Sequence, residues 1–411
     1  MRAYKIVSFS AAILLIAVLF AGAVTVPAAA QYDTMQFHYN VQHTGDYSPV
    51  AGPVPSNGQL LWNYTTSGSV ESPPAVANGV VYVGSTDNNT YALNATTGTE
   101  LWNYTTGGAV WSPPAVANGV VYVGSTDNNT YALNATTGAK LWNYTTGDLI
   151  YSSPAVANGV VYIGSTDNNT YALNATTGAK LWNYTTGSKV FSSPAVANGV
   201  VYVGSDDNNT YALNALTGTQ LWNYTTGGSV ESPPAVANGV VYVGSTDNNT
   251  YALNATTGAK LWNYTTGNAV LSSPAVANGV VYVGSTDNNT YALNATTGAK
   301  LWSYTTGGLV ASSPAVANGV VYVGSDDNNL YALNATTGAK LWSYTTGGYV
   351  DSSPSVVKGV VYVGSDDGNV YAIGSAAAAT SPGTPGFEVV LAFVALVFVG
   401  LLIVAYVVRR S

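Results

Sequence analysis

The sequence lacks cysteine altogether and carries only two histidines among its 411 residues. The absence of cysteine excludes disulfide bonds and thiolate metal sites. Charged residues make up 7% of the chain and the formal net charge is −8, which argues against nucleic-acid binding, because that function requires a basic face. Low charge does not indicate disorder here, because 47% of the residues are hydrophobic and β-forming residues are dense. We therefore expect a packed fold that does not bind nucleic acid.

What the sequence has in abundance is repetition. A Leu-Trp-(Asn/Ser)-Tyr-Thr-Thr motif recurs every forty residues in eight copies. Its tryptophans are Trp62, Trp102, Trp142, Trp182, Trp222, Trp262, Trp302 and Trp342. A fixed period of this length is typical of a repeat architecture.

Each forty-residue unit contains four short apolar runs separated by turn residues. In the third unit, Asn158-Gly159 is a hairpin signal between the first two runs, and the Asp and Asn residues at 167–169 favour a second turn. The residues between the turns are β-branched, aromatic or alternating in polarity, as strands require. The four runs are residues 153–157, 160–163, 170–173 and 181–185. Four antiparallel strands in forty residues make one blade of a β-propeller.

The number of runs predicts how the ring closes. Eight copies of the first three runs lie between Ser72 and Ile373, whereas the fourth-run motif first occurs earlier, at residues 60–66. The last copy ends at Ile373 without a fourth run of its own. We expect strand 60–66 to supply the outer strand of the last blade, which joins the ends of the ring and removes open sheet edges. The predicted fold is all-β, an eight-bladed propeller of four-stranded antiparallel blades over residues 58–373.

The segment from Ala172 to Trp182, ALNATTGAKLW, resembles the tryptophan-docking repeat of the pyrroloquinoline-quinone (PQQ) propeller superfamily. That pattern is Ala-x-Asp-x-x-Thr-Gly-x-x-x-Trp, and this chain carries Asn174 where Asp is usual. The resemblance covers about residues 37–373 and implies the propeller fold. It says little about chemistry, because many members bind no quinone and fold does not settle function.

The first thirty residues predict a secretory signal peptide. Arg2 and Lys5 form its basic region, residues 6–24 are apolar, and Ala28-x-Ala30 is a small-residue cleavage site. An uncleaved anchor is the alternative. Residues 31–57 then form a lead-in segment, which resembles the family's entry segment that packs against the propeller.

The C-terminal end predicts a membrane tether. Residues 389–408 are uncharged and mostly apolar, enough to span a bilayer as a helix. Arg409 and Arg410 follow and should stay cytoplasmic, which places the propeller outside the cell. A small-residue linker at 374–384 separates the propeller from this tail.

Residues 385–411 combine Pro-Gly-Phe, the apolar span and terminal arginines, and resemble the PGF-type sorting signal of archaeal surface proteins. The resemblance implies that an archaeosortase-like enzyme removes the tail and that a lipid anchor replaces it. A plain transmembrane anchor is the alternative. Both interpretations predict an extracytoplasmic, membrane-anchored protein at the cell surface.

Eighteen Asn-x-Thr sequons fit that location and predict a glycoprotein. The same residues are also what these turns require, so each sequon is only a candidate acceptor. Representative candidates are Asn63, Asn88, Asn94, Asn134 and Asn174.

The repeats differ mainly just after each Thr-Thr-Gly, where the chain enters the innermost strand of the next blade. One position there reads Glu71, Trp111, Tyr151, Phe191, Glu231, Leu271, Ala311 and Asp351. We predict an aromatic arc of Trp111, Tyr151 and Phe191 on consecutive blades, with Glu71, Glu231 and Asp351 around the rest of the rim. An apolar wall with a few polar groups suits a sugar, a cationic group or a peptide. The alternative is drift at an undemanding, exposed position.

Neither a metal site nor an enzyme is favoured by the residues. The recurrent Asp of the Asp87 type has too few neighbouring oxygens for calcium, which takes six to eight. The resemblance implies that a quinoprotein dehydrogenase of this superfamily would use a catalytic Asp, calcium and a vicinal cysteine pair. This chain has no cysteine. The two histidines, His38 and His43, lie in the lead-in, where a structural role is commoner than a catalytic one.

We therefore predict a non-enzymatic cell-surface binding or envelope-structural propeller with no cofactor, whose rim takes a carbohydrate or a protein. A PQQ- and calcium-dependent dehydrogenase is one alternative. A scaffold for envelope assembly that binds partner peptides across the rim is another.

Overall fold

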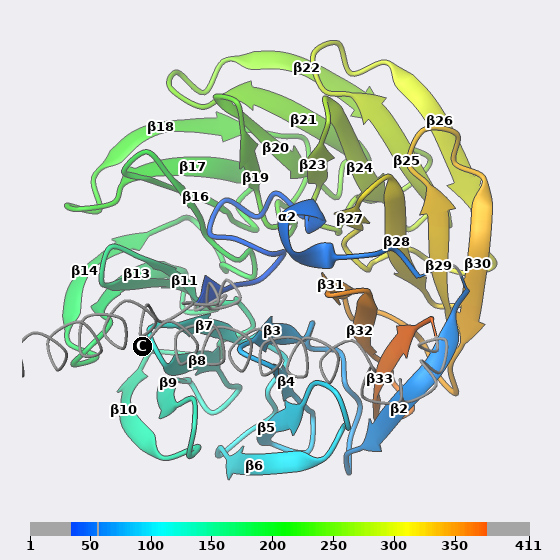
Figure 1. Ribbon diagram of the computed structural model, residues 1–411. Helices are drawn as coiled ribbons and strands as arrows, with labels where there is room; N and C mark the ends of the chain where they lie inside the picture. The colour runs from blue at the N-terminus through cyan, green and yellow to red at the C-terminus, as the bar shows by residue number, and fades with distance from the viewer. Residues whose placement is uncertain (1–33, 56, 376–411) are drawn as a thin grey trace, which may run out of the picture.

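A computed structural model describes residues 34–55 and 57–375. It shows eight antiparallel sheets arranged around a common axis (Figure 1), with one short helix, α2 (Ser48–Ala51), among the described residues. Seven of the sheets have four strands, and the sheet of the second blade gains a fifth, β1 (Thr34–Met35), at its inner edge. The predicted all-β, eight-bladed propeller is thereby confirmed. The predicted signal peptide, most of the linker and the sorting signal lie outside the described residues.

Blades 1 to 7 run from the innermost to the outermost strand in chain order. The first four blades are β3 (Ala75–Ala77), β4 (Val80–Gly84), β5 (Asn89–Asn94), β6 (Glu100–Thr105); β7 (Ala115–Ala117), β8 (Val120–Gly124), β9 (Asn129–Asn134), β10 (Lys140–Thr145); β11 (Ala155–Ala157), β12 (Val160–Gly164), β13 (Asn169–Asn174), β14 (Lys180–Thr185); β15 (Ala195–Ala197), β16 (Val200–Gly204), β17 (Asn209–Asn214), β18 (Gln220–Thr225). The next three are β19 (Ala235–Ala237), β20 (Val240–Gly244), β21 (Asn249–Asn254), β22 (Lys260–Thr265); β23 (Ala275–Ala277), β24 (Val280–Gly284), β25 (Asn289–Asn294), β26 (Lys300–Thr305); β27 (Ala315–Ala317), β28 (Val320–Ser325), β29 (Asn329–Asn334), β30 (Lys340–Thr345).

The eighth blade closes the ring with strands from both ends of the repeat array. Its inner strands are β31 (Ser355–Val357), β32 (Val360–Gly364) and β33 (Asn369–Gly374), and its outer strand is β2 (Gln59–Thr65). The pairing of β2 with β33 is antiparallel and runs from Gln59–Gly374 to Thr65–Asn369. The predicted closure by residues 60–66 is confirmed, with the strand beginning and ending one residue earlier than expected.

Tryptophan side chains tie each blade to the next. The Trp102 indole donates to the carbonyl oxygen of Ala135 in the following blade at 3.0 Å, and Tyr82 donates to the same oxygen at 3.1 Å. The turn that packs against the Trp102 indole needs glycine, because Gly138 has φ +71° and a Cβ there would lie 2.8 Å from the indole. Burial of such a large ring at each boundary gives the ring of blades much of its cohesion. Where the seventh blade meets the closing blade, the Trp342 indole donates instead to the carbonyl oxygen of Pro55, at 3.1 Å.

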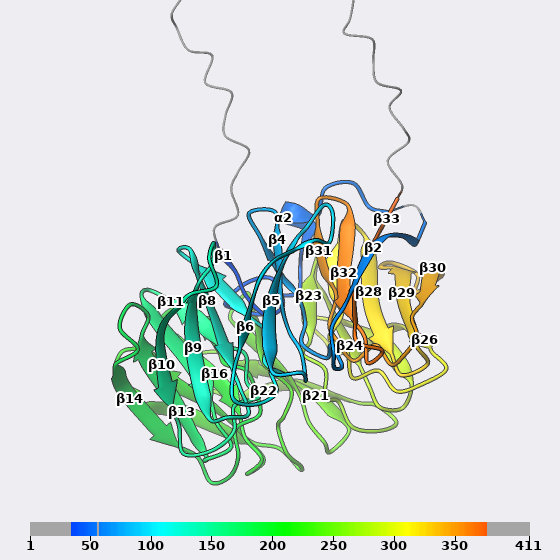
Figure 2. The same cartoon turned by 90° about the horizontal axis from the view of Figure 1, so that it is seen from below.

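The two faces of the propeller are built from different loops. Since the strands alternate in direction, the inner hairpins of the Asn158-Gly159 type and the turns after the third strand share one face, which we call the hub face. The turns of the Asp167–Asn168 type and the segments that enter the next blade share the opposite face, which we call the rim face. Both ends of the described chain, at β1 and β33, reach the hub face (Figure 2).

The lead-in crosses the centre of the ring on the hub face (Figure 1). It places one backbone carbonyl against the inner strand of each of four consecutive blades, at 2.7–2.8 Å. The acceptors are Val41 for Val196 N–H, Gln42 for Val236, Thr44 for Val276 and Gly45 for Val316. Each inner strand would otherwise leave an unpaired edge around the axis, and buried N–H groups need partners. The lead-in is thus a hub that caps these edges.

Candidate functional site at the rim face

The variable position of each repeat lies on the rim face, one residue after a buried anchor. In the third blade, Ile150 is fully buried and its N–H donates to Ser125 of the previous blade at 3.3 Å. Gly124 makes room for this anchor, because a Cβ there would lie 2.3 Å from an Ile150 methyl group. The anchor fixes the backbone, so the next residue, Tyr151, is free to vary without disturbing the core.

The three predicted aromatic residues contact one another in an arc. The Trp111 and Tyr151 ring centroids are 5.7 Å apart with planes at 86°, and those of Tyr151 and Phe191 are 5.4 Å apart at 48°. Trp111 is 39% exposed, while Tyr151 and Phe191 are half-buried. Lys189 Nζ lies 5.9 Å from the Phe191 ring centroid, within range of a cation–π contact. The arc thus presents one open indole backed by two packed rings.

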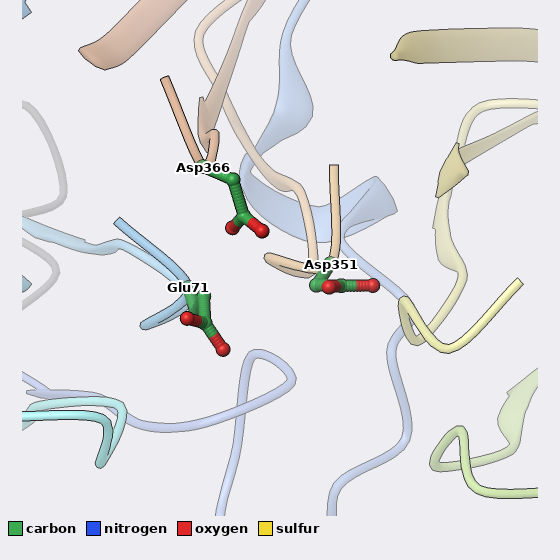
Figure 3. Close-up of side chains that lie close together, drawn as sticks. All are labelled: Glu71, Asp351 and Asp366. Atoms are coloured by element: carbon green, nitrogen blue, oxygen red, sulfur yellow. The ribbon is translucent and has the colours of Figure 1, made fainter. Parts of the chain in front are cut away.

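Carboxyl groups gather where the last blade meets the first. Glu71 precedes β3, Asp351 precedes β31 and Asp366 follows β32, and Figure 3 shows that their side chains lie close together. One oxygen from each lies within 4.8 Å of the others. Three such oxygens can bind a hard cation, although calcium usually takes six to eight. Of the three predicted rim acids, Glu71 and Asp351 are brought together, whereas Glu231 lies beyond the aromatic arc, on the fifth blade.

Sequence reasoning missed the partners of the rim acids. In three copies the turn reads Ser-Asp-Asp instead of Ser-Thr-Asp, which introduces Asp206, Asp326 and Asp366. Each of these faces a rim acid of the following blade: Asp206 acts on Glu231, Asp326 hydrogen-bonds Asp351, and Asp366 acts on Glu71. The other five copies keep Thr, and the rim residue of the blade that follows each of them is aromatic or aliphatic. This matched substitution was visible in the sequence, and it argues that the acids are placed in pairs.

Burial and mutual repulsion raise the pKa values of the rim acids. The pKa of Glu71 rises to about 7, first through burial and then through the charge of Asp366. The pKa of Asp351 rises to about 8, first through burial and then through its hydrogen bond and charge repulsion with Asp326. Burial followed by the charge of Asp206 also raises the pKa of Glu231. Near neutral pH Glu71 and Asp351 therefore hold protons or attract a cation.

The aspartates of the Asp87 type have a different role. Asp127 accepts hydrogen bonds from Gly107 N–H of the previous blade at 2.6 Å and from the Tyr131 hydroxyl at 2.6 Å, and its second oxygen accepts from Asn129 N–H. Burial acts to raise its pKa, but these hydrogen bonds outweigh burial and leave the pKa below its usual value. The recurrent Asp therefore ties neighbouring blades, and its oxygens are already used.

The two histidines lie in the hub and not at the rim. His38 Nε2 lies 2.6 Å from the Pro314 carbonyl oxygen, and His43 Nδ1 lies 3.1 Å from that of Pro234. Burial lowers the pKa of His38 to about 4. Burial, and then the neighbouring His38, lower that of His43 to about 3. Both are neutral side chains that hold the lead-in against inner strands.

A cleft of about 530 Å³ lies on the hub face, away from the rim residues. The lead-in from Tyr39 to Gln42 forms one wall, and the hairpins around Asn158 and Asn198 form the other. It is the space that remains beside the hub where the lead-in passes the third and fourth blades.

The candidate glycosylation sites fall into three environments. Asn63 lies exposed on the outer strand β2. Asn94 lies in a hub-face turn, where its side-chain oxygen accepts from Thr96 N–H at 2.9 Å, and Asn134 and Asn174 repeat this turn. Asn88 lies in a rim-face turn at φ +74°, and the hydroxyl of its sequon residue Thr90 is buried.

The family model described as outer membrane protein assembly factor BamB matches residues 50–153, 147–233, 225–313 and 305–380, nearly the whole propeller. The chain belongs to this family of PQQ-like repeat propellers. No curated protein sequence matches the chain.

Solved structures share the fold of this BamB-type propeller at low identity. BamB from Moraxella catarrhalis is 19% identical with a TM-score of 0.69, over 77% of this chain and 99% of that one. A computationally designed protein, Ika8, is 18% identical with a TM-score of 0.70, over 78% and 100%. The quinohemoprotein alcohol dehydrogenase of Comamonas testosteroni is 18% identical with a TM-score of 0.73, over 84% and 81%. An assembly factor, a designed protein and an enzyme thus share this fold, which leaves function to the site.

Proposed function

We propose that the protein is a non-enzymatic binding module whose site is the rim face, with the aromatic arc as its apolar wall. The observation that carries the proposal is the exposed Trp111 indole, 39% accessible and held edge-on by Tyr151, between carboxyl groups on the first and fifth blades. A single exposed tryptophan is ordinary, but a packed arc of three aromatic residues at one variable position of the repeat is costly, and binding would explain that cost.

The chemistry of the rim favours a ligand with a flat or apolar face and hydrogen-bond donors. An indole face suits a sugar ring or an aliphatic or aromatic peptide side chain. Glu71 and Glu231 flank the arc and would accept hydrogen bonds from hydroxyl or amino groups. The ligand classes are therefore carbohydrates and peptides or partner proteins.

The test is an array of oligosaccharides and short peptides probed with the purified protein and with a Trp111→Ala, Tyr151→Ala, Phe191→Ala triple variant. We expect the triple variant to lose tenfold or more in affinity for the ligand found, since stacking on an aromatic face contributes about 1–2 kcal/mol.

The matched control is Tyr349→Ala. Tyr349 is 52% exposed on the same face but lies on the last blade, outside the arc. The Tyr349→Ala variant should bind the ligand with the same affinity as the unchanged protein. If every detected interaction survives the triple substitution, the arc is not the site.

A scaffold role in envelope assembly is a second candidate, and the family match to an assembly factor favours it. On this proposal the rim takes partner peptides. The array separates the scaffold from a sugar-binding module, because a scaffold predicts peptide hits and a lectin-like module predicts sugar hits.

The rim does not fit the quinone site that the superfamily resemblance implies. The trio of Glu71, Asp351 and Asp366 offers oxygens for a cation, but the vicinal cysteine pair has no counterpart in a chain without cysteine. We derive no reaction step through a quinone. Absorption spectra of the protein mixed with PQQ and Ca²⁺ test this alternative directly.

A further inference from the structure

Charge is segregated between the two faces of the propeller. Among the described residues, every lysine except Lys189 lies on the hub face or at the hub-side end of an outer strand: Lys140, Lys180, Lys260, Lys300, Lys340 and Lys358. Every acidic residue except Asp46 and Glu100 lies on the rim face in the same part of the chain. A chain with a net charge of −8 therefore presents one cationic face.

Exposed leucines accompany these lysines. From β6 onward, each outer strand has a β-bulge at its second residue, which is a leucine that is 50–53% exposed. These leucines form a ring around the hub-side perimeter: Leu101, Leu141, Leu181, Leu221, Leu261, Leu301 and Leu341. Leu216 replaces the usual Thr of a hub-face turn and is 85% exposed, the most exposed large apolar side chain of the described residues. Lysine beside exposed leucine is the composition of a surface that meets a membrane interface.

The chain leaves the propeller from this same face. The strand β33 ends at Gly374 on the hub face, beside the Gly359 hairpin (Figure 2). Residues 376–388 then lead to the uncharged apolar run at 389–408, which is long enough to cross a bilayer. A tether at this point brings the cationic face, and not the acidic rim, toward the lipid. In the described residues no helix is long and apolar enough to cross a membrane.

We propose that the hub face lies against an anionic lipid surface, with its lysines over the headgroups and its leucines at the perimeter. The acidic rim then faces away from the membrane, where a ligand can reach it. The contact does not depend on the rim binding anything, so the two proposals fail independently.

The experiment uses the full chain reconstituted in vesicles that contain a lipid with a nitroxide on its headgroup. The absence of cysteine makes any introduced thiol unique. Thr136→Cys labels an exposed hub-face turn and Ser67→Cys labels an exposed rim-face position. With a thiol-reactive fluorophore, we expect the hub label to be quenched about threefold more than the rim label on anionic vesicles, and this difference to fall with salt.

Two comparisons separate contact from tethering. Replacing the five outer-strand lysines with glutamine should remove more than half of the hub-label quenching, whereas Lys189→Gln, the rim-face lysine, should remove none. Neutral vesicles should act like the five-lysine variant. Quenching of the hub label that is equal on neutral and anionic vesicles would show a tether alone and would overturn the proposal. So would equal quenching of both labels, or a hub label that is shielded at high protein concentration without any lipid, which would indicate a second copy on this face.

Discussion

The hub face and the rim face are made from the same forty-residue repeat, yet they treat polar groups in opposite ways. At the hub, carbonyls of the lead-in meet inner-strand N–H groups at 2.7–2.8 Å, and both histidines lie against carbonyl oxygens. At the rim, three pairs of acids face one another, and one oxygen of each of Asp206, Asp326 and Asp366 is buried without a partner. The hydrogen bonds of the hub therefore stabilise the fold, whereas the facing acids of the rim destabilise it.

This difference separates structural from functional variation. Residues that disagree between repeats are expected to be drift where nothing depends on them. The rim acids are costly, since like charges in contact and buried unpaired oxygens both destabilise a fold. Their matched occurrence in three copies, and only with the turn Asp, shows that the rim carries a cost that the other five copies avoid. Strain of this kind concentrates at functional sites.

The largest effect should come from filling the hub. Gly45 has φ +63°, and a Cβ there would lie 2.5 Å from His38 Nε2 and 2.7 Å from Ala275. We expect Gly45→Ala to lower the free energy of unfolding by about 3 kcal/mol or more, from left-handed strain together with overpacking. Urea unfolding followed by tryptophan fluorescence measures this.

Gly79→Ala is the matched control for that substitution. Gly79 has φ +78° in a hub-face hairpin, but no atom lies within 4 Å of the added Cβ. The Gly79→Ala variant should lose only the stability that left-handed backbone strain costs, about 1 kcal/mol. Equal losses for the two variants would show that the hub tolerates repacking and is not a rigid cap.

A smaller effect should distinguish two aspartates on the rim face, because their substitutions should change the free energy of unfolding in opposite directions. Asp327→Asn removes a charged acceptor from Gly307 N–H and the Tyr331 hydroxyl, and should destabilise the protein by about 1–2 kcal/mol. Asp351→Asn removes one of the facing acids, and should stabilise the protein at pH 9, where the raised pKa of about 8 leaves this carboxyl ionised among like charges.

Thermal unfolding of the two variants at pH 9 makes this comparison. Loss of stability in both would mean that Asp351 is held by favourable contacts, and that the rim is not strained. Gain of stability in both would remove the structural role assigned to the recurrent Asp.

The repeat made the frame of this protein readable from sequence. The eight tryptophans of the Trp102 type mark the blades, the Asn-Gly pairs mark the hairpins, and the unpaired motif at 60–66 marks the closure of the ring. Each could be read from the sequence because side chains of these types have one common structural role. The rim positions were found by comparing copies. The partner acids, such as Asp366, were overlooked because they lie inside a turn whose neighbour, Asp367, recurs in every copy. For the hub, the family resemblance predicted only that the lead-in packs against the propeller. Its hydrogen bonds to four inner strands come from backbone carbonyls of residues 41–45, which no side-chain pattern reveals.

The smallest effect, and the one that compares both faces in one measurement, is the dependence of stability on pH. The rim acids have raised pKa values, about 7 for Glu71 and about 8 for Asp351, so the folded state holds their protons more tightly than the unfolded state does. Their contribution to stability is present at low pH and is lost as the pH rises from about 4 to 8. The hub histidines have lowered pKa values, about 4 and about 3, so the unfolded state takes up protons first. Their contribution is present above pH 6.5 and is lost as the pH falls toward 3.

Stability should therefore decline in both directions from a maximum at weakly acidic pH. The rim acids with raised pKa values cause the alkaline limb, and the hub histidines cause the acid limb together with the recurrent aspartates, whose pKa values are lowered. Glu71→Gln should flatten the alkaline limb alone, because it removes a rim proton site and leaves the hub unchanged. His43→Asn keeps a donor near the Pro234 carbonyl but cannot titrate, and should flatten the acid limb alone. The measurement is the urea midpoint at intervals from pH 4 to 9 for the three proteins. If either substitution shifts both limbs, the two faces are coupled through the inner strands, and the division of labour between hub and rim is wrong.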